Sequence, residues 1–235
     1  MIKSCLRKSA IINGNTIKIL ALIFMTIDHI GVMLFPYIKI LRIIGRLSFP
    51  LFAFMIAEGC IYTKNKLKHF LMIFILGIVC QIVFYIVDGD IYQGILITFS
   101  LSILIIYSID YAIKSNKFIN FLLPMFTITV VALLNYVLPL AFSKGAFYFD
   151  YGFSGTMLAV LIYLPKGKWL KILFAFIGLI FVSLEAQWNT QWWSLLSLII
   201  LMFYSGQKGK LNLKYLFYVY YPLHFAIIYA ISFLL

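Results

Sequence analysis

The chain has 235 residues, of which 64% are apolar and only 11% charged, and its mean hydropathy is +1.06. Such values lie far outside the range of water-soluble domains and leave no room for a separate soluble domain. They indicate an all-α integral membrane protein, a single transmembrane bundle over residues 1–235. The net charge of +12 could suggest nucleic acid, but the basic residues are not gathered on a basic domain, so we expect no nucleic-acid partner.

Apolar runs of about 20 residues, the length that crosses a bilayer, recur along the whole sequence. We place nine membrane spans, at 17–35, 44–62, 70–87, 95–113, 118–142, 151–165, 169–185, 190–205 and 214–235. The sixth is short and opens with Gly152 and Gly155, which suggests a half-helix or re-entrant piece that protein or a water-filled cavity must cover. The first run has no small-x-small cleavage site, so we interpret it as a retained helix.

Loop charges predict the orientation, because cytoplasmic loops carry an excess of Lys and Arg. With the N-terminus inside, the inner side holds 15 of the 19 basic residues: Lys3, Arg7, Lys8, Lys18, Lys64, Lys66, Lys68, Lys114, Lys117, Lys166, Lys168, Lys171, Lys208, Lys210 and Lys214. The outer side keeps Lys39, Arg42, Arg46 and Lys144. We therefore expect a multi-pass protein of a bacterial inner membrane, surrounded by membrane lipids, with its N-terminus in the cytoplasm and its C-terminus outside.

Two titratable residues, Asp28 and His29, lie inside the first apolar span. Placing such a group in hydrocarbon costs about 3 kcal/mol or more of free energy, so titratable residues in a span usually have a chemical role or an internal partner. His29 could take a proton from an amine or a hydroxyl near neutral pH. Neighbouring helix positions point about 100° apart. Asp28 is therefore expected to hold a cation from another helix, Arg42 or Arg46, instead of orienting His29.

Arginine is rare here, since only three of the 19 basic residues are Arg. Arg42 and Arg46 share one helical face if their helix begins early, and both fall on the side where positive charge is disfavoured. Their planar forks suit a carboxylate, a phosphate or a polarised carbonyl. The alternative is snorkelling to the outer headgroups. The cysteines Cys5, Cys60 and Cys80 lack metal-ligand spacing, so we expect no metal site.

The last span carries His224, two residues after Pro222. Proline removes a backbone hydrogen bond, and kinks of this kind concentrate around cavities, which makes His224 a site candidate; a purely structural role stays open. Tyr221 and Asp150 are further candidates for substrate binding. Glu58 lies about 18 Å beyond Arg46 along the second span, where it either pairs with a lysine at the inner mouth or contributes to substrate binding.

Two segments carry a family resemblance. The run from Ile17 through Glu58, with IKILALIFMTIDHIG and LRIIGRLSFPLFAFMIAEG, and the run YSGQKGKLNLKYLFYVYYPLHF from Tyr204 to Phe225 resemble the TraX family. The middle of the chain, including Asp150, matches more loosely. The resemblance implies a membrane acetyltransferase, the namesake activity being acetylation of the pilin amino terminus in conjugation systems.

A more distant similarity is to membrane acyltransferase family 3, whose first helix has a basic residue, ten intervening residues and a His. Lys18 and His29 have this spacing, which puts them within about 20° of one helical face and roughly 16 Å apart along the axis. This geometry could hold a long cofactor arm. Because coenzyme A presents several phosphate charges, the candidates for binding acetyl-CoA are the inner-face lysines Lys18, Lys64, Lys66, Lys208 and Lys210.

The expected function is therefore transfer of an acetyl group from cytosolic acetyl-CoA to an amine or hydroxyl of a protein, peptide or glycan acceptor. His29 would be the general base, Asp28 its electrostatic support, and Arg42 and Arg46 would hold the acceptor or the thioester oxygen. The alternative is a proton-coupled transporter or flippase with Asp28, His29 and Glu58 as a relay; the lack of an internal repeat weighs against it. A non-catalytic assembly subunit would leave the buried pair unexplained.

Overall fold

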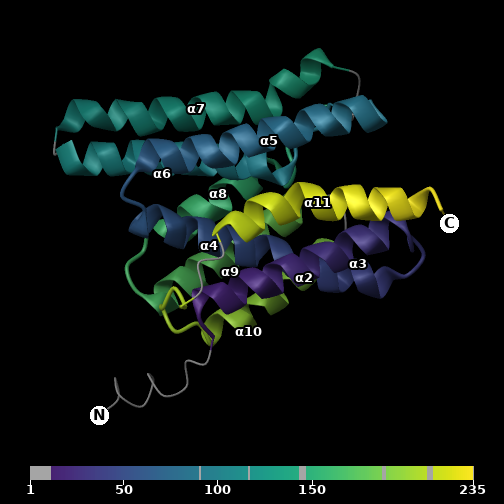
Figure 1. Ribbon diagram of the computed structural model, residues 1–235. Coiled ribbons are helices and arrows are strands. Elements are labelled where there is room, and N and C mark those ends of the chain that lie inside the picture. Colours follow the sequence, from purple (N-terminus) through teal and green to yellow (C-terminus); the bar gives the residue numbers. More distant parts are fainter. Residues whose placement is uncertain are drawn as a thin grey trace, which may run out of the picture.

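The computed structural model describes residues 12–89, 91–115, 117–142, 147–186, 189–210 and 214–234. Several residues named above lie outside these ranges: Lys3, Arg7, Lys8 and Lys144, which were used for the orientation, and Cys5. All regular structure within the described ranges is helical, with only two isolated bridges between extended residues (Figure 1). The expected all-α class is confirmed.

Each of the nine predicted spans contains helix within the part of the chain that the structure describes. The α-helices are α2 (Gly14–Met33), α3 (Lys39–Gly45), α4 (Ser48–Tyr62), α5 (Lys66–Asp88), α6 (Ile95–Ser115), α7 (Leu122–Tyr136), α8 (Gly152–Tyr163), α9 (Lys168–Glu185), α10 (Ser197–Met202) and α11 (Lys214–Ser232). Three 3₁₀ segments extend them: η1 (Phe118–Phe121), η2 (Leu138–Ala141) and η3 (Asn189–Leu196). Five of the helical stretches are long and apolar enough to cross a membrane, which identifies a membrane protein.

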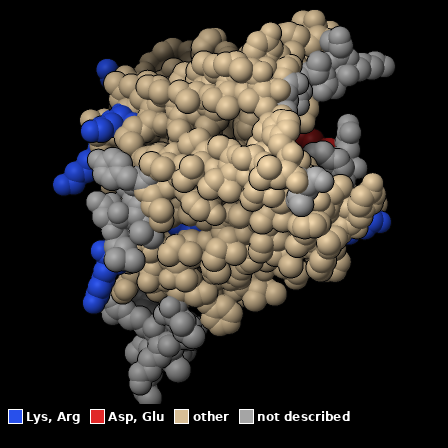
Figure 2. All heavy atoms as spheres, turned by 45° about the vertical axis from the view of Figure 1, so that its right-hand side comes forward, with Lys and Arg blue, Asp and Glu red and all other residues tan. Residues whose placement is uncertain are grey.

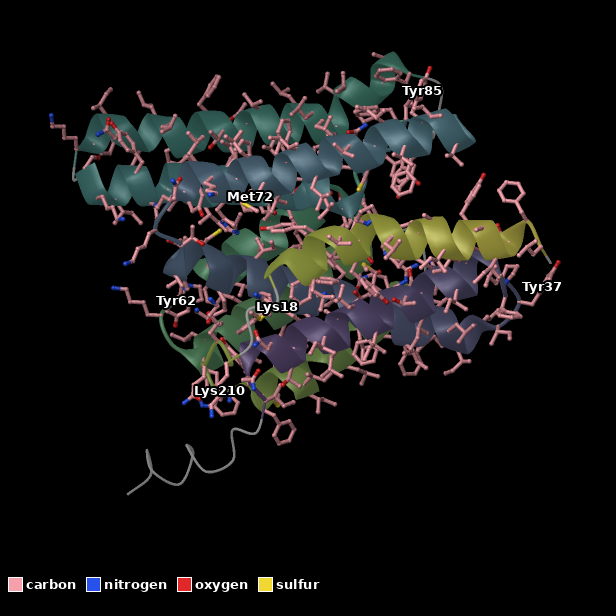
Figure 3. All side chains as sticks on the ribbon, in the orientation of Figure 1. Lys18, Tyr37, Tyr62, Met72, Tyr85 and Lys210 are labelled. Carbon is pink, nitrogen blue, oxygen red and sulfur yellow. The ribbon has the colours of Figure 1, made fainter. Side chains whose placement is uncertain are left out.

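The two ends of the bundle carry different residues. Lys18, Tyr62 and Lys210 lie toward one end, and Tyr37 and Tyr85 lie at the other (Figure 3). We call these the inner end and the outer end, after the predicted orientation. Helix α2 starts at the inner end and α11 finishes at the outer end (Figure 1). In the view of Figure 2, most basic side chains are gathered along one edge, as the loop charges led us to expect.

The short helix α8 is the centre of the bundle. It packs against α4, α6 and α9, and its 12 residues are about 18 Å long, well short of a bilayer core. Leu158, Ala159 and Ile162 are fully buried in the same core as Ile103 of α6 and Leu179 of α9. The interpretation of this segment as a short piece that needs protein cover is confirmed.

The second span differs from its predicted form, because helix begins at Lys39 instead of residue 44 and is interrupted at residues 46–47. Pro50 explains the interruption. Its ring nitrogen cannot donate a hydrogen bond to the carbonyl oxygen of Arg46, and its ring would clash with that carbonyl in a continuous helix. The early start puts both Arg42 and Arg46 beside α2.

Candidate functional site

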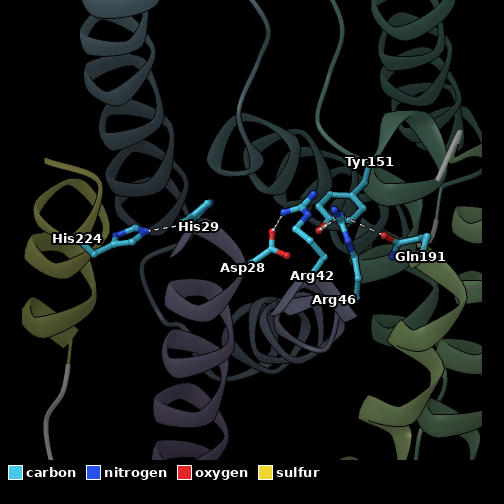
Figure 4. Close-up of polar contacts among 7 residues, drawn as sticks. All are labelled: Asp28, His29, Arg42, Arg46, Tyr151, Gln191 and His224. Carbon is cyan, nitrogen blue, oxygen red and sulfur yellow. Dashed lines mark hydrogen bonds and ion pairs between the residues drawn. The ribbon is translucent and has the colours of Figure 1, made fainter. Parts of the chain in front are cut away.

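An ion pair joins the first two spans in the outer half of the bundle (Figure 4). Arg42 Nη1 donates to Asp28 Oδ2 at 2.6 Å. Gly45 makes the approach possible, because a Cβ at this position would lie 2.2 Å from Asp28 Oδ1. The prediction that Asp28 holds an arginine of another helix is confirmed, and the partner is Arg42.

Arg46 lies in the same cluster at the break between α3 and α4, and only 3% of it is exposed. Its Nη1 donates to Tyr151 Oη and to Gln191 Oε1, both at 3.4 Å. Two buried polar atoms of the cluster, Asp28 Oδ1 and Gln191 Nε2, have no hydrogen-bond partner among the described residues. Buried polar atoms are normally satisfied, so these two are available to a ligand.

Tyr151 is held in place by an unusual local backbone. It has a left-handed conformation, with φ of 60°, which is uncommon for a bulky residue and often marks a functional position. Helix α8 starts directly after it, where the Glu185 carboxylate accepts hydrogen bonds from the N–H groups of Phe153 and Ser154. Gly152 leaves room for that carboxylate, because a Cβ there would lie 2.6 Å from Glu185 Oε1.

Asp150 belongs to the connection that precedes α8, next to the arginine cluster. Its backbone N–H donates to Gln93 O at 2.8 Å, and its carbonyl accepts from Thr98 Oγ1 at 2.9 Å. Burial raises the pKa of the Asp150 carboxyl to about 7, although the charge of Arg46 opposes the shift. This carboxyl can therefore exchange a proton near neutral pH.

The two histidines of the prediction meet where α11 packs on α2, on the helix face next to that of Asp28 (Figure 4). His29 Nδ1 and His224 Nε2 are 2.9 Å apart, and His224 Nδ1 lies 2.9 Å from the carbonyl oxygen of Tyr220. The Phe225 ring is 4.2 Å from the His29 ring, centroid to centroid. His29 and His224 are 195 positions apart in the sequence.

The hydrogen bonds of the histidine pair assign its protons. A carbonyl oxygen only accepts, so His224 Nδ1 carries the hydrogen and, in a neutral ring, its Nε2 is the acceptor. His29 Nδ1 must then donate to His224 Nε2. This leaves the lone pair on His29 Nε2, for which no hydrogen bond is found among the described residues. His29 is held in the tautomer that a general base needs.

The remaining substrate-binding candidates separate. The Tyr221 ring contacts His224 at 5.7 Å between centroids and so belongs with the histidine pair. Glu58 does not join either group. Its Oε1 is paired with Lys171 and its Oε2 accepts from Tyr204 Oη at 3.1 Å, at the inner end. Of the two readings of Glu58, pairing with a lysine of the inner mouth is confirmed.

The lysines predicted to bind acetyl-CoA form two groups. The segment 203–208 runs along the start of α2, where Gly14 N donates to Gln207 O at 2.7 Å and Asn15 N to Lys208 O at 3.1 Å, so that Lys18, Lys208 and Lys210 lie in one region. Lys64 lies in the connection between α4 and α5, and Lys66 is the first residue of α5. Lys66 forms an ion pair with Asp110, which occupies its ammonium group.

Sequence reasoning missed four residues of these two clusters: Tyr151, Gln191, Tyr220 and Phe225. Gln191 has a usable signal, because it is an amide within a segment read as a membrane span, and polar groups there are costly. The αL conformation of Tyr151 gives no signal in one sequence. Tyr220 acts through its backbone carbonyl, which any residue would supply.

The fold and these clusters define a polytopic membrane protein with a polar centre buried between α2, α3, η3 and α11. The chain belongs to the TraX protein family, which matches residues 13–232. It is 23% identical to the probable fimbrial assembly protein FimC, serogroup H1, of Dichelobacter nodosus, over 90% of this chain and 92% of that protein. It is 46% identical to the uncharacterized protein RP591 of Rickettsia prowazekii (strain Madrid E) over 28% of this chain, which corresponds to a quarter (25%) of the Rickettsia protein. No solved structure matches.

Proposed function

We propose that this TraX-family protein is a membrane acetyltransferase. It takes an acetyl group from cytosolic acetyl-CoA and delivers it to an amine or hydroxyl of an acceptor within the bundle. The observation that carries the proposal is the hydrogen-bonded chain from the Tyr220 carbonyl through His224 to His29, because it leaves His29 Nε2 with a free lone pair. An ordinary core histidine does not need a second histidine to fix its tautomer.

The reaction follows from this base. The nitrogen or oxygen of the acceptor attacks the carbonyl carbon of the thioester, and its proton passes to His29 Nε2. A carbon–nitrogen or carbon–oxygen bond forms, the carbon–sulfur bond breaks, and the proton on His29 moves to the departing sulfur. His29 acts first as the base and then as the acid. His224 is a positioning residue that keeps the His29 ring in the required tautomer.

The arginine cluster supplies positive charge beside this base. In this proposal Arg42 and Arg46 hold the acceptor, or the thioester oxygen as negative charge develops on it. Gln191 Nε2, which has no hydrogen-bond partner among the described residues, adds an amide donor to this cluster. Asp28 neutralises one of the two arginines, and Asp150, with a pKa of about 7, offsets the other only when it is ionised. While Asp150 holds its proton, the cluster has a net positive charge, which favours a negatively charged group.

Lys18, Lys208 and Lys210 support a donor that enters from the inner end. Lys18 lies roughly 16 Å from His29 along α2, so a long, flexible arm would bring the thioester to the base while the phosphates stay at the lysines. Lys64 and Lys66 are less suitable, because Lys66 already pairs with Asp110.

Family membership and the FimC similarity support a role in pilus or fimbria assembly, for which we propose a bacterial inner membrane as the location. The proposed acceptor is therefore a pilin or peptide amino terminus. The transporter alternative requires Asp28, His29 and Glu58 to form a relay. It is less well supported, because Glu58 is committed to Lys171 and Tyr204 at the inner end.

The test is acetyl transfer by the purified protein, in detergent or liposomes, from radiolabelled acetyl-CoA to peptides with free or blocked amino termini. His29→Ala is expected to lower the rate by about a hundredfold or more, the usual worth of acid–base catalysis. His224→Leu is expected to cost about tenfold, less than loss of the base itself, because His29 remains and only its tautomer is no longer fixed. His224→Gln should recover part of that loss, because the amide oxygen of the glutamine can accept the hydrogen bond that His29 Nδ1 donates.

His69 is the matched control, because it is also hydrogen-bonded, to Tyr107 Oη at 2.7 Å, but lies on α5 near the inner end. His69→Ala should leave the rate near that of the wild type. If His29→Ala transfers acetyl at the wild-type rate, the assignment of the base is wrong. If the wild type transfers no acetyl but carries protons across liposomes in a His29-dependent way, the protein is a transporter.

A further inference from the structure

A groove lined by residues of α5 and α11 lies away from the proposed reaction centre. Its volume is about 560 Å³, within the range of small-molecule sites. In Figure 1 the two helices run side by side, but α5 packs on α6 and α11 packs on α2. The protein therefore leaves the seam between α5 and α11 partly open.

The chemistry of the groove changes along its length. The α5 wall is apolar from Leu71 through Ile75 to Val79, and the opposite wall includes the Tyr218 ring. The inner end of the groove holds two polar residues, Asn65 and Lys68. None of the three ion pairs found between described residues uses Lys68, which is exposed. One end thus carries a positive charge and the rest is hydrocarbon.

The length, volume and polarity of the groove indicate which kind of molecule can bind in it. From Lys68 to Val79 the groove follows α5 for roughly 16 Å, about half of the 30 Å hydrocarbon core of a bilayer. A transmembrane helix of the same length is 10–12 Å wide and would occupy on the order of 1,200 Å³, twice the space available. A polar chain such as the arm of coenzyme A would leave its amide groups without partners against this wall. A single acyl chain matches the length, the volume and the apolar character of the groove.

We propose that the α5–α11 groove binds one acyl chain of an anionic phospholipid, with the lipid phosphate at Lys68 and Asn65. The lipid comes from the inner leaflet, because Lys68 lies toward the inner end and the groove is one leaflet deep. The apolar wall supplies chain binding and Lys68 supplies the preference for negative headgroups. This site is independent of acetyl transfer.

The test compares phosphatidylglycerol with phosphatidylcholine of identical acyl chains, titrated into the delipidated full-length protein and followed by native mass spectrometry. Wild type should retain one phosphatidylglycerol, bound about fivefold more tightly than phosphatidylcholine, the effect expected of one lysine near a headgroup. Lys68→Gln should remove the preference and keep chain binding. Since Lys68 is exposed, this variant keeps the fold.

Val79→Trp fills the groove and should abolish retention of either lipid. Ile78→Trp is the matched control, because Ile78 is the next residue of α5, is similarly exposed (38% against 50%) and does not line the groove. It should bind lipid like the wild type. Equal retention by Val79→Trp and Ile78→Trp, or an unchanged preference in Lys68→Gln, would overturn the proposal. So would a Val79→Trp variant whose only change is in oligomeric state, because the groove would then be a protein interface.

Discussion

The inner end and the outer half of this bundle both bury charged residues, but they treat them differently. At the inner end both oxygens of each acid are satisfied: Glu58 by Lys171 and Tyr204, and Asp110 by Lys66 and Tyr163. In the outer half, by contrast, Asp28 uses only one oxygen for Arg42, and Gln191 uses its oxygen but not its nitrogen. Satisfied acids stabilise a fold, whereas buried atoms without partners cost free energy that a ligand can recover.

The largest effect should come from breaking an inner pair. Glu58→Gln leaves the Lys171 ammonium buried without its counter-ion, so the free energy of unfolding should fall by about 3–5 kcal/mol. Thermal unfolding in detergent measures the change. The double variant Glu58→Gln with Lys171→Met should recover most of the loss, and acetyl transfer per folded molecule should stay unchanged. If the double variant folds but does not transfer acetyl, the Glu58–Lys171 pair is functional, and the contrast between a structural inner end and a functional outer half is wrong.

A smaller loss of stability but a larger loss of activity should follow Asp28→Asn. The pair with Arg42 is only partly buried, with 16% and 24% of the two side chains exposed, so the cost should be about 1–2 kcal/mol. Acetyl transfer should fall about tenfold or more. Asp28→Asn combined with Arg42→Met should restore the melting temperature without restoring transfer. Restored transfer would make the pair a structural one, like those at the inner end.

The smallest effect is the pH dependence of Asp150. The folded protein holds the proton of this carboxyl more tightly than the unfolded chain does, because burial raises its pKa to about 7. The stability of the wild type should therefore decline as pH rises from about 4, the pKa of an unperturbed Asp, to 7. Asp150→Asn should remove that decline, so its melting temperature should exceed that of the wild type at pH 8 and equal it at pH 4. Parallel curves for the two proteins would contradict the assignment.

Periodicity and hydropathy were enough to predict the fold class and the presence of helix in each span, because a bilayer admits few alternatives. The pairing of Asp28 with an arginine could be predicted, because helix geometry points Asp28 about 100° away from His29 and the outer side offers Arg42 and Arg46 as partners. The meeting of His29 and His224 did not, since nothing in the sequence says which face of α11 docks on α2. The helix break at Arg46 was not predicted, although Pro50 is a sequence signal for it. Hydropathy does not show that Pro50 cannot donate a backbone hydrogen bond to Arg46.

Helix α8 has a consequence for biogenesis. Twelve residues are too few to cross the membrane alone, so the translocon cannot release α8 as an independent span. It has to enter together with α9, its closest partner, as a helical hairpin. The loop that presents Tyr151 to Arg46 is fixed only when Glu185, at the far end of α9, reaches the start of α8. Because Gln191 and His224 follow α9 in the chain, the polar centre can be complete only after α11 has been synthesised.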